Sequence, residues 1–406
     1  MSGLVTAELL DRVRDRLAAS TAAEPTAATV ADAVRAESAG VLGDTDLLEV
    51  VRILQTELTG AGPLESLLHE PGVADVLVTA PDQVWVDRGV GLERTSVKFA
   101  DEAAVRRLAA RLALSSGRRL DDAQPWVDGR LRGVGDGHFG VRLHAVLAPV
   151  AQGGTCLSLR VLRPATQGLD ALCARGAIEP EARALLDRII MCRLAFLVIG
   201  GTGAGKTTLL SAVLGAVDPR ERIICVEDAA ELAPPHPHVV RLVARAPNVE
   251  GVGEVAVRDL MRQALRMRPD RIVVGEVRGA EVIDLLTALN TGHDGGAGTI
   301  HANSPEEVPA RLEALAALGG MDRHALHSQL AAAVQVVLHV HRSADGSRRL
   351  EQIGVINRGA DGFVHINQAW PAAGPGRDQL ERMLRLRDRD GRSDRDGRSD
   401  RDGLPA

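Results

Sequence analysis

The sequence predicts an α/β protein with a parallel sheet in its C-terminal half and a smaller α+β region before it. Two observations support this prediction. From about residue 169 to residue 372, short apolar runs alternate with helical patterns, which is typical of parallel strands joined by crossover helices. A glycine-rich loop also joins one of these apolar runs to a helix. The strands predicted for this sheet are 196–200, 222–227, 239–243, 271–275, 297–301 and 334–341.

The region before this sheet falls into two parts. Residues 1–60 are alanine-rich with helical periodicity, and they predict either a small helical domain or a helical arm. Residues 61–165 predict an α+β domain, because an amphipathic helix over 101–115 stands among alternating apolar strands. A linker is predicted over 164–168, before the α/β segment 169–375. The strands expected in the α+β domain are 73–79, 83–87, 140–147 and 155–162.

The end of the chain carries a repeat without apolar residues. The sequence Arg-Asp-Gly-Arg-Ser-Asp occupies 389–394 and again 395–400. Because a repeat of mixed charge cannot bury apolar surface, the sequence predicts a disordered tail over 376–406, at least from Asp388 onward. A solvated extension and an interaction tail are both compatible with this composition.

The composition argues against several kinds of function. The net charge of −6 provides no basic field for nucleic acid or for membrane surfaces. Aromatic residues make up only 2% of the chain, so a nucleic-acid partner that depends on base stacking is not expected. The most apolar window, 189–199, is interrupted by Arg193 and is too short to span a bilayer. With no recognisable signal peptide, we expect a cytoplasmic protein without direct membrane insertion.

The four cysteines show no Cys-x-x-Cys pairing. They are Cys156, Cys173, Cys192 and Cys225. We expect buried free thiols in a reducing compartment, and neither disulfides nor zinc ligands.

The glycine-rich loop has the chemistry of a phosphate-binding loop. Glycines let consecutive backbone N–H groups curl around a phosphate, and the compact ammonium of Lys206 can reach the β/γ-oxygens. Thr207 can supply a hydroxyl to Mg²⁺. The loop lies between the apolar run 195–199 and a helical pattern over 207–217, and this context favours nucleotide binding over an accidental glycine-rich turn. The candidate binding residues are Gly200, Gly201, Thr202, Gly203, Ala204, Gly205, Lys206, Thr207 and Thr208.

Acidic residues end two of the predicted strands. Glu227 ends the run 223–227, with Asp228 directly after it, and Glu276 follows the run 271–275. Because strand ends in a parallel sheet face the ligand crevice, these carboxylates can hold magnesium-bound water or act as a general base. Glu276 is the preferred candidate for the base. A helix-capping role is an equally good reading of Asp228.

Two histidines, His293 and His301, flank a glycine-rich segment and the start of a strand. Zinc is not expected here, because this segment offers too few ligands. Sensing of the γ-phosphate or coupling to a neighbouring subunit fits better, since an imidazole can donate a hydrogen bond to a phosphate oxygen.

Together these four segments resemble the secretion ATPase superfamily of type II and type IV secretion systems and type IV pili. They look like its phosphate loop, its acidic Asp box with Glu227, its second Walker strand that ends in Gly-Glu, and its His box with His293 and His301. The resemblance implies a RecA-like P-loop NTPase domain behind a PAS-like α+β domain and a helical extension. It also implies that Arg142 and Arg160 reach the nucleotide from the α+β domain.

The resemblance further implies ATP and Mg²⁺ as cofactors, with Thr207, Glu227 and Glu276 at the magnesium ion, partly through water. It implies a homo-hexamer that acts on an inner-membrane platform protein of a pilus or secretion machine. The protein would then be cytoplasmic and peripherally associated with the inner face of the membrane through its partners.

Within the superfamily, the chain lacks the tetracysteine zinc module of general secretory ATPases, so no zinc is expected. Its helical extension and the runs 74–79 and 84–89 look most like the tight-adherence (Tad/Flp) pilus branch, next to the conjugal-transfer ATPases. Two alternatives stay open, a conjugation-type motor that handles DNA and a non-motor P-loop kinase or regulator. The low aromatic content disfavours the first, and the His box has no obvious use in the second.

Overall fold

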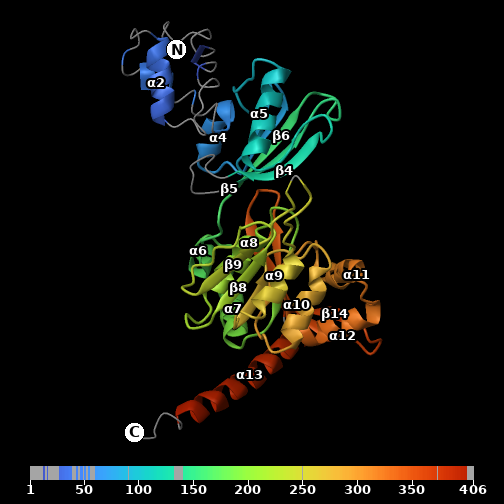
Figure 1. Ribbon diagram of the computed structural model, residues 1–406. Coiled ribbons are helices and arrows are strands. Elements are labelled where there is room, and N and C mark those ends of the chain that lie inside the picture. Colours follow the sequence, from blue (N-terminus) through green and yellow to red (C-terminus); the bar gives the residue numbers. More distant parts are fainter. Residues whose placement is uncertain are drawn as a thin grey trace, which may run out of the picture. The chain divides into compact units, whose positions relative to one another are not determined.

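The protein is described here by a computed structural model, drawn in Figure 1. The described chain divides into two compact units, Met1–Arg163 and Pro164–Ala406. Side chains are described as far as Asp388. The described residues are 12–13, 16, 27–38, 43, 46–48, 50–51, 54, 60–89, 91–131, 140–248, 250–372 and 374–399.

The first unit contains an antiparallel sheet of six strands in the order β3-β2-β1-β6-β5-β4. One face of this sheet packs against the helix α5 (Glu102–Ser115), which buries Val105, Leu108 and Leu112. The four strands predicted from the sequence are all present. The strands are β1 (Asp75–Ala80), β2 (Gln83–Asp87), β3 (Leu92–Arg94), β4 (Trp126–Leu131), β5 (Gly140–Val146) and β6 (Cys156–Leu162).

The sequence did not predict β3 or β4, and both have weak local signals. The three residues of β3 are all exposed, so no apolar alternation marks them. In β4, Gly129 interrupts the pattern, because a side chain there would collide with Ser116.

Only part of the predicted helical extension lies within the described residues. It includes the helix α2 (Ala27–Glu37). The short elements η1 (Gly62–Leu64) and α4 (Glu65–His69) lie at the start of the segment predicted as the α+β domain. A small apolar cluster joins α2 to neighbouring residues. Its buried members are Val13, Val30, Ala33, Val34, Leu47, Val50, Val51 and Leu54.

The second unit contains an eight-stranded sheet in the order β14-β13-β12-β7-β11-β10-β8-β9. The six strands predicted from the sequence run parallel to one another. The sequence did not predict β13 and β14, which add an antiparallel edge to the sheet; each follows its neighbour through a short turn. The strands are β7 (Phe196–Ile199), β8 (Ile223–Glu227), β9 (Val239–Val243), β10 (Arg271–Val274), β11 (Ala297–Ile300), β12 (Val336–Arg342), β13 (Arg348–Arg358) and β14 (Val364–Trp370).

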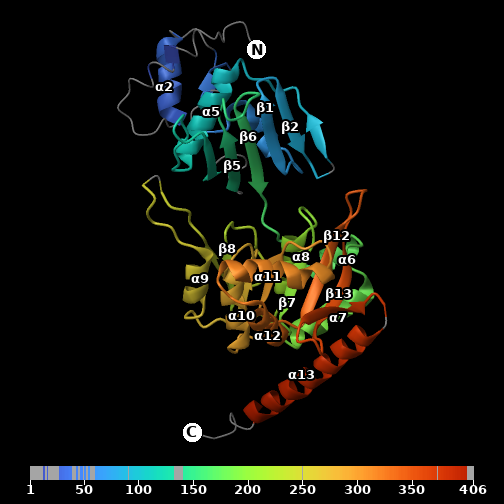
Figure 2. The ribbon, with the colours of Figure 1, turned by 90° about the vertical axis from the view of Figure 1, so that its right-hand side faces the viewer.

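Helices cover both faces of this sheet (Figure 2). Phe196 and Val198 face the core beneath α6, α7 and α8, whereas Leu197 and Ile199 face the core beneath α9 to α12. Alternating side chains therefore leave β7 buried on both faces. Because the six strands run parallel, their carboxyl ends lie along one edge of the sheet. The helices are α6 (Leu169–Ala174), α7 (Pro180–Met191), α8 (Lys206–Gly215), α9 (Val257–Ala264), α10 (Glu281–Asn290), η2 (Pro305–Glu307), α11 (Val308–Leu318) and α12 (Arg323–Ala333).

The four cysteines are free thiols, and Cys192 and Cys225 are buried. In the part of the chain that the structure describes, no helix combines the length and the apolar character needed to cross a lipid bilayer.

A long helix, α13 (Pro375–Ser399), occupies the region predicted to be a disordered tail. Leu380 and Leu384 on this helix are fully buried in the core of the second unit, and Arg188 donates two hydrogen bonds of 2.9 Å to Glu381. The prediction of disorder is therefore wrong for residues 376–388. The prediction failed because it relied on the mixed-charge repeat that begins at residue 389. The apolar residues that anchor the helix, Leu380 and Leu384, lie before that repeat.

We expect Leu380→Ala to lower the free energy of unfolding by about 2–5 kcal/mol, because it leaves a cavity in the core. Leu386→Ala on the same helix is the matched control, since that side chain is 61% exposed, and it should change stability by less than about 0.5 kcal/mol. Urea unfolding of both variants measures the difference. Equal, small effects would show that α13 does not pack on the unit in solution.

Candidate functional site

The glycine-rich loop connects β7 to α8 at the carboxyl edge of the sheet. Gly200, Gly203 and Gly205 have φ values of 152°, 69° and 99°, in the region where residues with a Cβ are strained. A Cβ at Gly200 would lie 2.3 Å from the carbonyl oxygen of Val340 on β12. Glycine is therefore required at Gly200 both by its backbone angle and by the neighbouring strand.

Lys206 is the first residue of α8, and its side chain folds back into the loop. Its Nζ donates hydrogen bonds to the carbonyl oxygens of Gly200 at 2.9 Å and Gly201 at 3.0 Å. Burial lowers the pKa of this ammonium, while the nearby carboxylate of Glu276 acts in the opposite direction.

His301 connects the ammonium of Lys206 to the carboxylate of Glu276. Its Nδ1 lies 3.3 Å from Lys206 Nζ, and its Nε2 lies 2.6 Å from Glu276 Oε1. In a neutral imidazole Nδ1 can accept a hydrogen bond from the ammonium of Lys206. Glu276 Oε1, although it lies close to Nε2, is buried without a hydrogen-bond partner. Burial and the charge of Lys206 lower the pKa of His301, in agreement with the neutral form.

A second carboxylate, Glu227, ends β8 and is almost fully buried. Its Oε1 accepts hydrogen bonds from the backbone N–H groups of Glu231 at 2.9 Å and Leu232 at 2.8 Å, whereas its Oε2 is buried without a hydrogen-bond partner. Burial raises the pKa of Glu227 to about 7, against the opposing effect of the two N–H groups. Gly275 permits this packing, because a Cβ there would lie 2.7 Å from Glu227 Cγ.

Arg278 joins the two acidic segments. It donates a hydrogen bond to Glu276 Oε2 and lies 3.4 Å from a carboxylate oxygen of Asp228. Asp228 accepts a hydrogen bond from the N–H of Ala229, the residue directly after it.

A small cavity of about 20 Å³ lies between the loop and the carboxylates. This volume accommodates about one water molecule or a small ion. The hydroxyl and carboxylate oxygens around it are the ligands that Mg²⁺ prefers. The unpartnered oxygen of Glu227 is therefore explained if a cation or its water occupies the cavity. The lining residues are Thr207, Glu227, Asp228, Ala229, Glu231, Gly275 and Glu276.

A larger cavity of about 540 Å³ lies beside the loop in the same unit. It is lined by loop residues on one side and by the β12–β13 hairpin on the other, and Arg348 of the hairpin donates a hydrogen bond to the carbonyl oxygen of Gly203 at 2.8 Å. Its volume is within the range of small-molecule sites. The sequence did not indicate this cavity, because its walls come from 167–178, the loop and 340–350, which share no motif.

His293 does not join this cluster. It lies between α10 and β11, where its Nδ1 is 3.1 Å from the carbonyl oxygen of Ala288. His301 follows β11, so the whole length of that strand separates the two imidazoles. Within one chain His301 therefore lies at Lys206 and Glu276, whereas His293 does not contact them. A role of His293 in sensing the γ-phosphate or in coupling to a neighbouring subunit stays a prediction.

Arg142 and Arg160 lie opposite each other on β5 and β6 of the first unit. Each guanidinium is paired with a carboxylate: Arg142 binds Asp128 through two nitrogens at 3.1 and 2.7 Å, and Arg160 binds Asp75 at 2.8 Å. These pairs offset the repulsion between like charges on adjacent strands. A role of either arginine at the nucleotide is considered below as a proposal.

Known proteins resemble this chain over most of its length. The family model for type II/IV secretion system protein matches residues 57–371. A putative conjugal transfer protein of Mycobacterium tuberculosis is 72% identical over 332 residues, which cover 82% of this chain and 94% of the relative. A type IV secretion system protein PtlH homolog of Bordetella bronchiseptica is 31% identical over 314 residues, covering 70% of this chain and 91% of the relative.

A solved structure resembles the fold. The X-ray structure of the ATPase DotB of Yersinia pseudotuberculosis superposes with a TM-score of 0.50 at 18% identity, covering 75% of this chain and 76% of that chain. At this identity the likeness concerns the fold alone.

The raised pKa of Glu227 leads to a prediction for the protein without nucleotide or metal. As the pH rises from 4.5 through about 7, the Glu227 carboxyl ionises in the unfolded chain at a lower pH than in the folded chain. The free energy of unfolding of the wild type therefore falls by up to about 3 kcal/mol relative to its value at acidic pH. Glu227→Gln cannot ionise and should lack this loss. We therefore expect the stability of the variant relative to wild type to increase by up to about 3 kcal/mol between pH 4.5 and pH 8.

Urea unfolding at several pH values with a chelator present measures this effect. The exposed Glu254→Gln serves as the control and should follow the wild-type pH profile. A constant difference between Glu227→Gln and wild type across this range would contradict the burial of an ionisable carboxylate at this position.

Proposed function

Because this chain belongs to the type II/IV secretion system protein family, we propose that it is an ATPase that powers pilus assembly or secretion. The observation that carries the proposal is the meeting of Lys206, His301, Glu276 and Glu227 at one edge of the sheet. A phosphate loop, a buried cation, two carboxylates and a cavity for a small ion are what hydrolysis of a nucleoside triphosphate requires.

We propose ATP and Mg²⁺ as the cofactors. The glycines of the loop and Lys206 would hold the β/γ-phosphates, and Thr207 with Glu227 and Glu276 would hold Mg²⁺, partly through water. Bound Mg²⁺ neutralises charge on the phosphate oxygens. The base and ribose would lie in the larger cavity, which adjoins Ala204, Gly205 and Thr208.

The two carboxylates would have different tasks. The oxygens of Glu276 already contact His301 and Arg278, so this residue orients the cluster and keeps the ammonium of Lys206 compensated. Glu227 has an oxygen without a partner in the small cavity and a pKa near 7, so it can hold a water molecule there and take up its proton. This division modifies the preference for Glu276 as the base.

His301 would link this chemistry to the phosphates. A neutral imidazole in contact with both Lys206 and Glu276 responds when the charge next to the ammonium changes. Loss of a phosphate would change that charge and thereby shift the hydrogen bonds of His301.

We further propose that six copies form a ring on the cytoplasmic face of the inner membrane and act on a platform protein. Closure of the first unit over the nucleotide would bring Arg142 and Arg160 to the phosphates and exclude water. Head-to-tail contacts in such a ring close by cyclic symmetry. Within the family, the Tad/Flp pilus branch remains our proposal for the pathway.

A DNA-transfer motor is the second candidate. It rests on the name of the Mycobacterium tuberculosis relative, a putative conjugal transfer protein. Stimulation of ATP hydrolysis by DNA would favour this candidate over a pilus motor.

We expect Lys206→Ala to lose most nucleotide binding, because it removes the cation from the phosphate loop. Glu227→Gln and Glu276→Gln should retain nucleotide but lower turnover by roughly 100-fold or more, since each disturbs water positioning or proton transfer. Nucleotide binding by fluorescence titration and phosphate release measure the two effects separately.

Lys98→Ala is the matched control, since Lys98 is the other lysine of the chain and is exposed. It should behave as wild type. Wild-type turnover in both glutamine variants would exclude the proposed hydrolytic site.

Arg142→Ala and Arg160→Ala should each raise the barrier to hydrolysis by roughly 2–4 kcal/mol if the guanidinium stabilises charge on the phosphates. Steady-state turnover per folded molecule measures this effect, with the exposed Arg94→Ala on the same sheet as control. A loss of stability with unchanged turnover would mean that these arginines only neutralise Asp128 and Asp75.

A further inference from the structure

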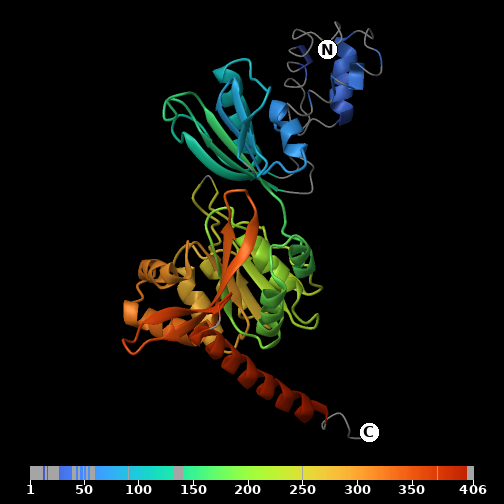
Figure 3. The same cartoon turned by 180° about the vertical axis from the view of Figure 1, so that it is seen from behind.

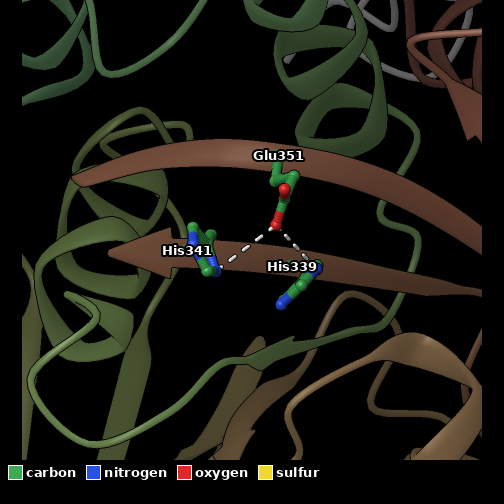
Figure 4. A group of neighbouring side chains, drawn as sticks. All are labelled: His339, His341 and Glu351. Atoms are coloured by element: carbon green, nitrogen blue, oxygen red, sulfur yellow. Dashed lines mark ion pairs between the residues drawn. The ribbon is translucent and has the colours of Figure 1, made fainter. Parts of the chain in front are cut away.

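A second group of potential ligands lies on the β12–β13 hairpin. His339 and His341 on β12 and Glu351 on β13 bring their ligand atoms within 4.8 Å of one another. Figure 4 shows Glu351 extending from its strand toward both imidazoles. We propose that these three residues bind a transition-metal cation with the ligand preferences of Zn²⁺.

The strand geometry explains how the three side chains meet. His339 and His341 are two residues apart, so they lie on the same face of β12. His339 pairs with Gln352 and Val340 pairs with Leu350, which leaves Glu351 as the extra residue of a β-bulge. A bulge redirects a side chain, and here it turns Glu351 onto the face that carries both histidines.

The distances suit a shared cation better than two hydrogen bonds. Glu351 Oε2 lies 3.5 Å from His339 Nδ1 and 3.6 Å from His341 Nδ1, at or beyond the limit for a hydrogen bond. Zn²⁺ bonds to nitrogen and oxygen measure about 2.0–2.2 Å, and in a tetrahedral site two such ligands lie about 3.3–3.5 Å apart. Small side-chain rotations would therefore complete a site for one cation.

The exposure of the ligands also fits. His339 is 6% exposed, so one ligand lies at the buried side of the group. The side chains of His341 and Glu351 are about half exposed, at 51% and 48%. Three protein ligands with one side open to solvent leave a fourth position for water, as in two-histidine, one-carboxylate zinc sites.

The position of the hairpin gives such a cation a structural consequence. β12 pairs with β7 so that His339 lies beside Ile199, the residue just before the glycine-rich loop. Arg348, near Glu351 on β13, donates its hydrogen bond to Gly203 of that loop. A cation bound by residues of both β12 and β13 would therefore stabilise the hairpin in its position next to the loop. Figure 3 shows these strands from behind.

The test uses the full-length protein after treatment with a chelator. Isothermal titration with Zn²⁺ should show one site, and Co²⁺ should give the visible absorption of a tetrahedral complex. His341→Gln and Glu351→Gln should each weaken Zn²⁺ binding at least 10-fold, while Mg²⁺ should not compete, because it prefers oxygen ligands. Both substitutions are at half-exposed side chains, so their metal-free melting temperatures should equal that of wild type.

His365→Gln is the matched control, because His365 is an exposed histidine with one carboxylate neighbour, Asp361, at 3.0 Å. It should bind Zn²⁺ as wild type does. Three results would each overturn the proposal: wild-type affinity in the double variant His341→Gln/Glu351→Gln, an equal loss in His365→Gln, or a sulfur-to-cobalt absorption band that places the ion on a cysteine. None of these results depends on ATP hydrolysis.

Discussion

The buried ammonium of Lys206 is the contact on which the arrangement of the site depends. Burial disfavours its charge, so the side chain needs the carbonyl oxygens of Gly200 and Gly201 and the negative charge of Glu276. His301 connects that charge to the ammonium without adding one of its own. These residues come from the ends of three different strands, and the parallel order β7-β11-β10-β8 brings those ends to one edge.

The burial of Glu227 lowers the stability of the folded chain at neutral pH and at the same time suits a catalytic role. A carboxylate that is nearly fully buried destabilises the folded chain at neutral pH, and two backbone N–H groups compensate it only in part. Gly275 on the adjacent strand makes room for it. A buried acid whose pKa is raised beside a small polar cavity is typical of a catalytic site, which connects this local cost in stability to the proposed hydrolysis.

The antiparallel β12–β13 hairpin joins three features that are separate in the sequence. The carbonyl oxygen of Val340 leaves no room for a Cβ at position 200, and Arg348 donates a hydrogen bond to the carbonyl oxygen of Gly203 in the loop. The same hairpin forms a wall of the larger cavity and carries His339, His341 and Glu351. The hairpin therefore contacts the phosphate loop in two ways, through the pairing of β12 with β7 and through Arg348.

The sequence by itself determined the phosphate loop, the parallel strands and the family, because glycines, Lys206 and apolar runs are local signals that fix backbone conformation. It could not determine which charges meet. His301 reaches Lys206 whereas His293 lies at the other end of β11, and the length of that strand decides the difference. Likewise Leu380 anchors a helix in a region whose composition indicated disorder, and a bulge turns Glu351 toward two histidines. Such contacts depend on strand order, register and burial, which only the tertiary structure sets.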